Sequence, residues 1–179
     1  MLGVPFLARS ADIDETPAPG ERPTDYVRRM AVEKADAIWS TLSVGAAEDT
    51  WVLGSDTSVI IDGKILGKPQ DEQDAQEMLS LLSDRVHEVI TSVCLRGPTR
   101  SDVRNSATEV EFLALSASDI KQYWRSGEPR DKAGAYGIQG KGARFVRRIN
   151  GSFHAVMGLP VDVAADMLVA AGFRLWQEE

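Results

Sequence analysis

Cysteine and long apolar runs are nearly absent from this chain of 179 residues. Its one cysteine, Cys94, excludes an internal disulfide and a zinc site built from several cysteines, which fits a reducing compartment. No apolar stretch approaches the ~20 residues that a membrane-spanning helix needs. The N-terminus also has no basic segment followed by an apolar one, the pattern of a signal peptide. We therefore expect a cytoplasmic protein that does not bind a membrane.

Basic residues are too few for a nucleic-acid-binding surface. The 20 Lys and Arg residues stand against 27 Asp and Glu residues, for a net charge of -7. Broad contact with a nucleic-acid backbone requires a basic face, so we expect no nucleic-acid partner. Neither a Walker phosphate-binding loop nor a dinucleotide-binding fingerprint occurs. A polyanionic ligand would need a local cationic pocket, together with a divalent metal that offsets the surrounding carboxylates.

The predicted elements include both helices and strands, which indicates an α/β or α+β fold for one domain. Apolar residues repeat at helical spacing from Thr24, the expected N-cap, to Leu42. Residues 51–55 and 58–66 are expected strands, and the second forms a hairpin around an Asp-Gly turn. The other expected elements are a strand at 4–9, helices capped by Asp71 and Ser116, strands at 86–96, 108–115 and 144–149, and a helix from Pro160 to Gly172.

Acidic side chains provide the first candidates for chemistry. Asp56 lies where an apolar strand ends, so its carboxylate can act as a general base or as a metal ligand. The alternative is a turn aspartate that binds its own backbone. Asp14 and Glu15 lie in an acidic, proline-rich turn and could ligate magnesium together with Asp56. Turn acids are more often simply solvated.

Two lysines and a glutamine provide the second set. Lys34 lies beside the apolar stripe of the long helix, where it could contact phosphate or extend past the core edge into water. Lys68 is fixed between a glycine and a proline, although a solvated lysine is the simpler interpretation. Gln139 belongs to the glycine-rich segment 131–140, which can bring backbone groups and an amide against a flat ligand such as a base.

Five short motifs follow one another along the chain. They are Glu33-Lys34-Ala35, Gly54-Ser55-Asp56-Thr57, Leu66-Gly67-Lys68-Pro69, residues 131–140 and Val156-Met157-Gly158-Leu159-Pro160. In this order and spacing they resemble the Maf family of nucleotide pyrophosphatases. The resemblance extends from Gly3 to Gly172, and a chance match to all the motifs is not credible.

The resemblance implies an α/β fold with a mixed, elongated sheet flanked by helices and two lobes around a nucleotide cleft, all in a single domain over residues 1–179. It also implies hydrolysis of a nucleoside triphosphate between its α and β phosphates, which releases pyrophosphate and leaves the monophosphate. A divalent cation, Mg²⁺ or Mn²⁺, is the cofactor implied. The partner implied is the nucleotide substrate, and a homodimer is one of the oligomeric states that the sequence allows.

Individual residues match the family's functional positions. Asp56 matches the catalytic acidic residue, and Lys34 and Lys68 match its phosphate-binding lysines. Asp14 or Glu15 matches its upstream carboxylate, which places the metal at Asp14, Glu15 and Asp56. Thr57 and Gln139 match the positions associated with recognition of the base, and they are the substrate-binding residues that the resemblance implies.

The family's branches differ in substrate. Asp56-Thr57 and the run Tyr136-Gly-Ile-Gln139 resemble the branch that prefers dTTP and UTP. The run at 12–17 and Ser55 instead resemble the branch that acts on methylated GTP. Base-contacting residues carry more weight, because they meet the feature that differs between the substrates. A general house-cleaning hydrolase for non-canonical nucleotides, and a regulatory nucleotide-binding protein in the arrest of septum formation, remain alternatives.

The start of the chain departs from the family pattern. Family members begin with a strand, a Ser-x-Ser-Pro-Arg-Arg loop and a helix ahead of the segment equivalent to residues 2–5. The resemblance therefore implies one of two explanations. Either the start codon has been placed at an internal methionine, or the chain is truncated and has lost a central strand and a phosphate-binding arginine.

Overall fold

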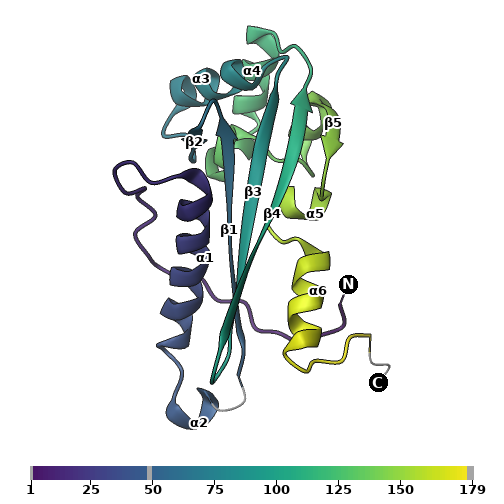
Figure 1. Cartoon of the computed structure of the whole chain (residues 1–179). Coiled ribbons are helices and arrows are strands. Elements are labelled where there is room, and N and C mark those ends of the chain that lie inside the picture. The colour runs from purple at the N-terminus through teal and green to yellow at the C-terminus, as the bar shows by residue number, and fades with distance from the viewer. Residues whose placement is uncertain (1, 48–49, 177–179) are drawn as a thin grey trace. The chain divides into compact units, whose positions relative to one another are not determined.

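One five-stranded antiparallel sheet, flanked by helices, runs through the computed structural model, which describes residues 2–47 and 50–176 (Figure 1). Its strand order is β2-β1-β3-β4-β5. The mixture of sheet and helices confirms the expected α/β class. The strands are β1 (Val52–Ile61), β2 (Lys64–Leu66), β3 (Val86–Arg96), β4 (Ser101–Phe112) and β5 (Val146–Asn150).

The chain divides into two compact units. Unit 1 comprises Met1–Asp56, Thr91–Ser106 and Gly158–Glu179, and unit 2 comprises Thr57–Ile90 and Ala107–Met157. The expected single domain and the expected cleft between two lobes stay predictions. None of the helices in the described residues combines the length and the apolar character that crossing a membrane requires.

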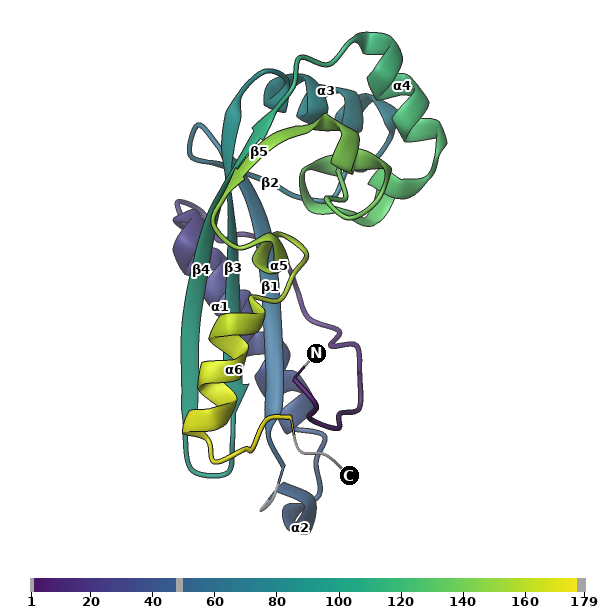
Figure 2. The same cartoon turned by 90° about the vertical axis from the view of Figure 1, so that its right-hand side faces the viewer.

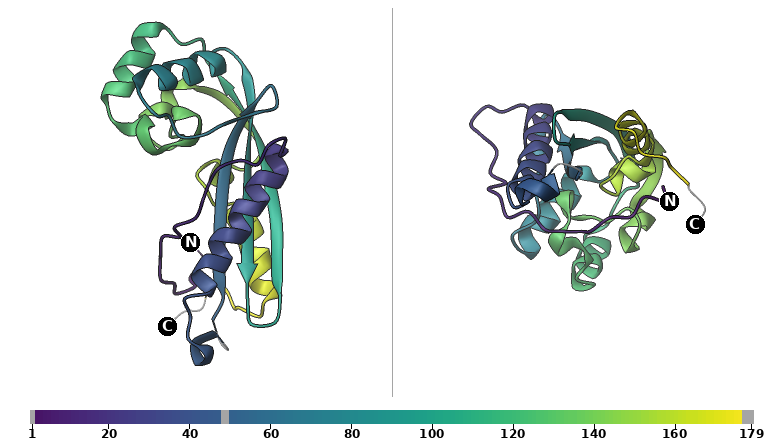
Figure 3. Two further views of the ribbon diagram at one scale, coloured as in Figure 1. Left: turned by 90° about the vertical axis from the view of Figure 1, so that its left-hand side faces the viewer. Right: turned by 90° about the horizontal axis from the view of Figure 1, so that it is seen from below.

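Unit 1 has helices on both faces of its strands. Figure 2 shows α6 in front of the strands with α1 behind them, and the left view of Figure 3 shows the reverse. Side chains alternate between the two faces along β3, as they must in a strand. Cys94 is buried against α1, whereas Val93 and Leu95 are buried against α6. The helices of this unit are α1 (Pro23–Trp39), α2 (Val44–Ala47) and α6 (Val161–Ala170).

Two expectations for unit 1 are wrong. The long helix has Arg22 as its N-cap rather than Thr24, because Pro23 occupies the first turn. Proline suits that position, since its fixed φ is helical and its missing N–H would have been unpaired there. Residues 4–9 form no strand, although most of them are apolar. A strand requires a hydrogen-bonded neighbour, and the side chains of Phe6 and Leu7 are exposed instead.

Unit 2 confirms the local signals that the sequence contains. Asp71 accepts a hydrogen bond from the Asp74 amide at the start of α3, and Ser116 forms the expected capping box with Asp119 at the start of α4. The hairpin between β1 and β2 turns at an Asp-Gly pair whose φ angles are both positive. The helices of unit 2 are α3 (Glu72–Leu82), α4 (Ala117–Arg125) and α5 (Phe153–Val156). Its 3₁₀ turns are η1 (Glu128–Asp131), η2 (Ala133–Ala135) and η3 (Lys141–Phe145).

A buried histidine lies in the core of unit 2. The His87 side chain is 2% exposed, and its Nε2 atom lies 2.8 Å from the Tyr136 hydroxyl. The Phe112 ring contacts the imidazole edge to face, at 4.9 Å between centroids. The Nδ1 atom of His87 has no hydrogen-bond partner among the described residues. Burial lowers the pKa of His87 from 6.5 to about 4, so the neutral imidazole is part of the core.

This pKa shift predicts a loss of stability in mild acid. Between pH 6.5 and about 4 the unfolded chain binds a proton at His87 and the folded chain does not. The free energy of unfolding should therefore fall as the pH drops through this window, by roughly 3 kcal/mol in total. Urea unfolding at a series of pH values, compared with His87→Gln, measures the effect. The exposed His154→Gln is the control, and a wild-type slope no steeper than that of His87→Gln would contradict the assignment.

Candidate active site

Strand β1 directs Asp56 toward helix α1. Successive side chains of a strand point to opposite faces, so Gly54 and Asp56 share one face and Ser55 lies on the other. Gly54 lies directly against the α1 backbone. The Ser55 hydroxyl is within hydrogen-bond distance of the carbonyl oxygens of Ser92 (3.1 Å) and Gly158 (2.7 Å), which anchors the strand.

Lys34 joins two carboxylates at this position. Its Nζ atom lies 2.6 Å from Asp56 Oδ1 and 2.8 Å from Glu15 Oε1. The side chains are partly shielded from water, with exposed fractions of 21% for Lys34, 11% for Asp56 and 39% for Glu15. Burial lowers the pKa of Lys34, but the hydrogen bonds and charges of Asp56 and Glu15 outweigh that effect and the pKa is raised overall. Lys34 therefore carries a positive charge between two negative ones.

Tyr26 attaches the Glu15 segment to α1. Its hydroxyl donates a hydrogen bond to the carbonyl oxygen of Glu15, at 2.8 Å. Burial, and to a smaller degree the negative charges of Asp56 and Glu15, raise the pKa of Tyr26. The phenol is therefore a constant donor at neutral pH, and it fixes the backbone from which the Glu15 carboxylate extends.

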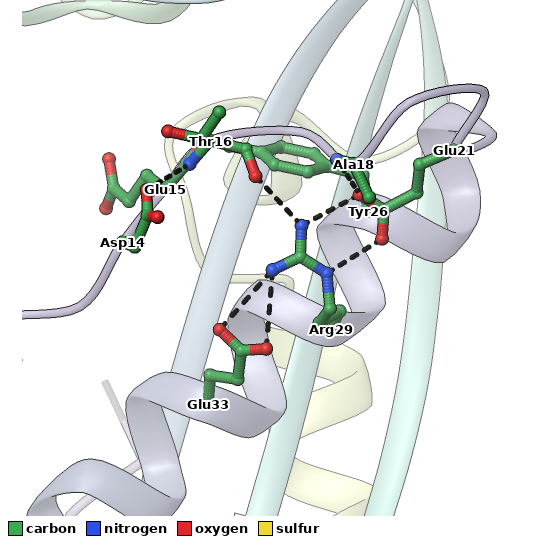
Figure 4. A network of polar contacts seen from close by, with 8 residues as sticks. All are labelled: Asp14, Glu15, Thr16, Ala18, Glu21, Tyr26, Arg29 and Glu33. Atoms are coloured by element: carbon green, nitrogen blue, oxygen red, sulfur yellow. Dashed lines mark hydrogen bonds and ion pairs between the residues drawn. The ribbon is translucent and has the colours of Figure 1, made fainter.

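Arg29 attaches the residues that follow Glu15. Its guanidinium group donates to the Thr16 carbonyl oxygen (3.1 Å), to both carboxylate oxygens of Glu21 (2.8 Å each) and to Glu33 (3.3 Å), as Figure 4 shows. The hydrogen bond from Arg29 lowers the pKa of Glu21 to about 2. The planar fork of an arginine can hold several acceptors at once, which a lysine cannot. Arg29 thus connects the loop to one face of α1.

Sequence reasoning missed Tyr26, Arg29 and Glu21. The only local signal was the spacing of Arg29 and Glu33, which places the two residues one helical turn apart. The bonds to Thr16 and Glu21 connect a helix to an irregular loop, and no periodicity predicts such contacts.

The predicted metal ligands are not assembled as a group of three. Among the described residues, no cluster of three or more His, Cys, Asp and Glu side chains could hold a metal ion. Asp14 instead closes its own turn, because its Oδ1 atom accepts the Thr16 amide at 2.9 Å. Glu15 and Asp56 both contact the Lys34 ammonium group, so two carboxylates meet at one place. Magnesium commonly binds one or two carboxylates together with substrate phosphates, so this pair fits a cation that arrives with a nucleotide.

Unit 2 carries the other predicted site residues. Lys68 follows β2 and is exposed, and Gln139 is exposed in the segment that follows η2. A hydrogen bond from the Gly134 amide to the Gly67 carbonyl oxygen (3.0 Å) joins these two segments. The pKa of Asp131 is lowered chiefly by Lys132 and to a smaller extent by the charge of Lys68. Thr57 lies in β1, and the roles of Thr57, Lys68 and Gln139 stay predictions.

The α/β fold agrees with the family that the motifs suggested. The chain matches the family model described as Maf-like protein over residues 1–171. The chain therefore belongs to the Maf family.

Several curated relatives match most of the chain. A dTTP/UTP pyrophosphatase of Pseudoalteromonas atlantica is 49% identical over 160 residues, which is 89% of this chain and 83% of the relative. A protein of the same name from Hahella chejuensis is 46% identical over 177 residues, or 99% of this chain and 87% of the relative. A third, from Aliivibrio fischeri, is 49% identical over 89% of this chain and 84% of its own length.

Proposed function

We propose that the protein is a nucleoside triphosphate pyrophosphatase that hydrolyses dTTP and UTP to the monophosphate and pyrophosphate. The observation that carries the proposal is the contact of Lys34 with both Asp56 and Glu15. This contact brings together the Asp56 carboxylate, which can accept a proton, the Lys34 ammonium group, which can bind phosphate, and the Glu15 carboxylate. The names of the similar proteins, dTTP/UTP pyrophosphatases, support the choice of substrate.

Hydrolysis of a phosphoanhydride needs mainly positioning and neutralisation of charge. Asp56 orients a water molecule and accepts its proton as the oxygen attacks the α phosphorus. Lys34 is held at the same carboxylate, so it can exchange a carboxylate oxygen for a phosphate oxygen when the nucleotide binds. Lys68 is proposed as a second phosphate-binding cation. No covalent nucleophile is required.

A divalent cation is proposed as the cofactor. Glu15 and Asp56 would hold it together with phosphate oxygens, and it would neutralise charge that develops on the leaving pyrophosphate. Glu15 takes the place of the upstream carboxylate, because Asp14 is engaged in its own turn. Mg²⁺ or Mn²⁺ is the cation proposed, and the cytoplasmic location and the homodimer stay predictions.

Base recognition is proposed for Thr57 and Gln139. The glutamine amide can both donate and accept a hydrogen bond, as the edge of a uracil or thymine ring requires. Both residues belong to the motifs that resemble the dTTP and UTP branch.

The test is product analysis with purified protein and dTTP, UTP and a methylated GTP, with Mg²⁺ or Mn²⁺. We expect pyrophosphate from dTTP and UTP, with a higher kcat/KM than from methylated GTP. Release of orthophosphate alone would contradict cleavage between the α and β phosphates. Binding of the nucleotides without turnover would support the regulatory alternative.

A further inference from the structure

The Glu128 carboxylate lies inside a turn of the chain in unit 2. Its Oε2 atom accepts the Lys141 amide at 2.8 Å, and its Oε1 atom accepts the Gly142 amide at 3.0 Å. The Tyr123 hydroxyl donates to the same Oε1 atom at 2.8 Å. The carboxylate therefore holds backbone groups that follow Gln139.

Tyr123 holds the backbone on the other side of Gln139. Its side chain is 5% exposed, and its hydroxyl oxygen accepts the Gly137 amide at 2.9 Å. Together, Glu128 and Tyr123 bind the amides of residues 137, 141 and 142. Gln139 itself is exposed at the centre of this turn.

The turn is shaped around the carboxylate. A Cβ atom at Gly140 would lie 2.5 Å from the carboxyl carbon and from both oxygens of Glu128, closer than real Cβ contacts come. The space that a side chain of residue 140 would fill therefore belongs to Glu128. Partial burial raises the pKa of Glu128, but the hydrogen bonds from Gly142, Lys141 and Tyr123 outweigh it, so the pKa is lowered overall. The carboxylate is charged at neutral pH, and hydrogen bonds to a charged acceptor are the stronger kind.

We propose that Glu128, together with Tyr123, is a positioning residue that fixes the turn 137–142 and thereby aims Gln139 at the base. This role rests on the proposed function. A glycine-rich turn has wide backbone freedom, and an amide that reads a base must be held within a fraction of an ångström. Glu128 supplies that rigidity through backbone amides. Glu128 affects selectivity by positioning Gln139 and does not contact the substrate itself.

The first part of the test measures the turn without any substrate. Hydrogen exchange of segment 137–142 is compared in wild type, Glu128→Gln, Glu128→Ala and Tyr123→Phe. Glu88→Gln is the control, because it removes one exposed negative charge from the same unit. We expect exchange in the turn to be at least about tenfold faster in Glu128→Ala and unchanged in the control. Glu128→Gln and Tyr123→Phe keep the shape of the site, so they serve if Glu128→Ala does not fold. Equal exchange in all of the folded variants would overturn the proposal.

The second part measures selectivity. The ratio of kcat/KM for dTTP to that for a methylated GTP should fall by about tenfold in Glu128→Ala, chiefly through a higher KM for dTTP. A purely structural role would lower both values by the same factor and leave the ratio unchanged, which would refute the positioning role. In a Gln139→Ala background, the Glu128→Ala change should have no further effect on the ratio, since the two residues act in series. A further drop would also overturn the proposal.

The two proposals fail in different ways. If the wild-type protein releases pyrophosphate from neither dTTP nor UTP, the proposed function is wrong and base selection by this turn is wrong with it. If the wild type shows the expected preference and the Glu128 variants keep it, only the positioning role is wrong.

Discussion

Asp56→Asn is expected to lower kcat for dTTP by about 10²-fold or more, in the range for removal of a positioned general base. The amide has nearly the same volume as the carboxylate, but it cannot accept the proton of the attacking water. Lys34 keeps its ion pair with Glu15, so its charge stays paired. The melting temperature should therefore change little.

Measurement of pyrophosphate release and thermal melting on the same preparations separates the two effects. Asp166→Asn is the matched control in unit 1, because Asp166 is exposed on α6 and the substitution changes the charge by the same amount. If Asp56→Asn retains most of its kcat while the control is normal, Asp56 is not the base. An equal loss in both variants would point to a general effect of charge.

Gly54→Ala is expected to destabilise the protein by about 1–3 kcal/mol, the range for overpacking of a tight interior contact. The added Cβ atom would lie 2.5 Å from the Ala31 carbonyl oxygen and 2.8 Å from the Ala35 amide nitrogen. Both are backbone atoms of α1 and cannot rotate away. Helix α1 and strand β1 must therefore move apart, which increases the distance between Lys34 and Asp56. Turnover should therefore fall together with stability.

Urea unfolding measures the stability change, and pyrophosphate release from the folded fraction measures turnover. Gly45→Ala is the control, because a Cβ atom there meets nothing within 4 Å. If Gly54→Ala unfolds at the same urea concentration as the control, β1 and α1 have room for a methyl group between them, and the prediction is wrong. Normal kcat in a destabilised variant would show that the spacing of Lys34 and Asp56 tolerates the shift.

Local signals in the sequence were sufficient for two helix caps and one turn, where the interaction is itself local. Asp71 and Ser116 cap their helices through amides only three residues away, and the Asp-Gly hairpin turns within a few residues. Helical spacing on α1 placed Lys34 beside Ala31 and Ala35, which lie against the strand. The motifs also identified Asp56, Lys34 and Glu15 as candidate site residues, and the structure brings those three together.

Contacts between distant segments were beyond the sequence patterns. The strand expected at 4–9 is absent because apolar character does not supply a hydrogen-bonded neighbour. Asp14 and Glu15 are adjacent acids in one turn, and nothing in their spacing says which of them closes the turn and which reaches Lys34. That choice depends on how Tyr26 and Arg29 of α1 hold the backbone of the turn.

The sequence by itself therefore determined the family, the α/β class, the caps at Asp71 and Ser116, the Asp-Gly turn and a set of candidate site residues. Only the tertiary structure decided which carboxylate joins Lys34 and Asp56, and that Glu128 occupies the turn around Gln139. The physical reason is that capping and turn formation depend on neighbouring residues. A shared cation or a carboxylate inside a loop instead requires segments to meet after the chain has folded.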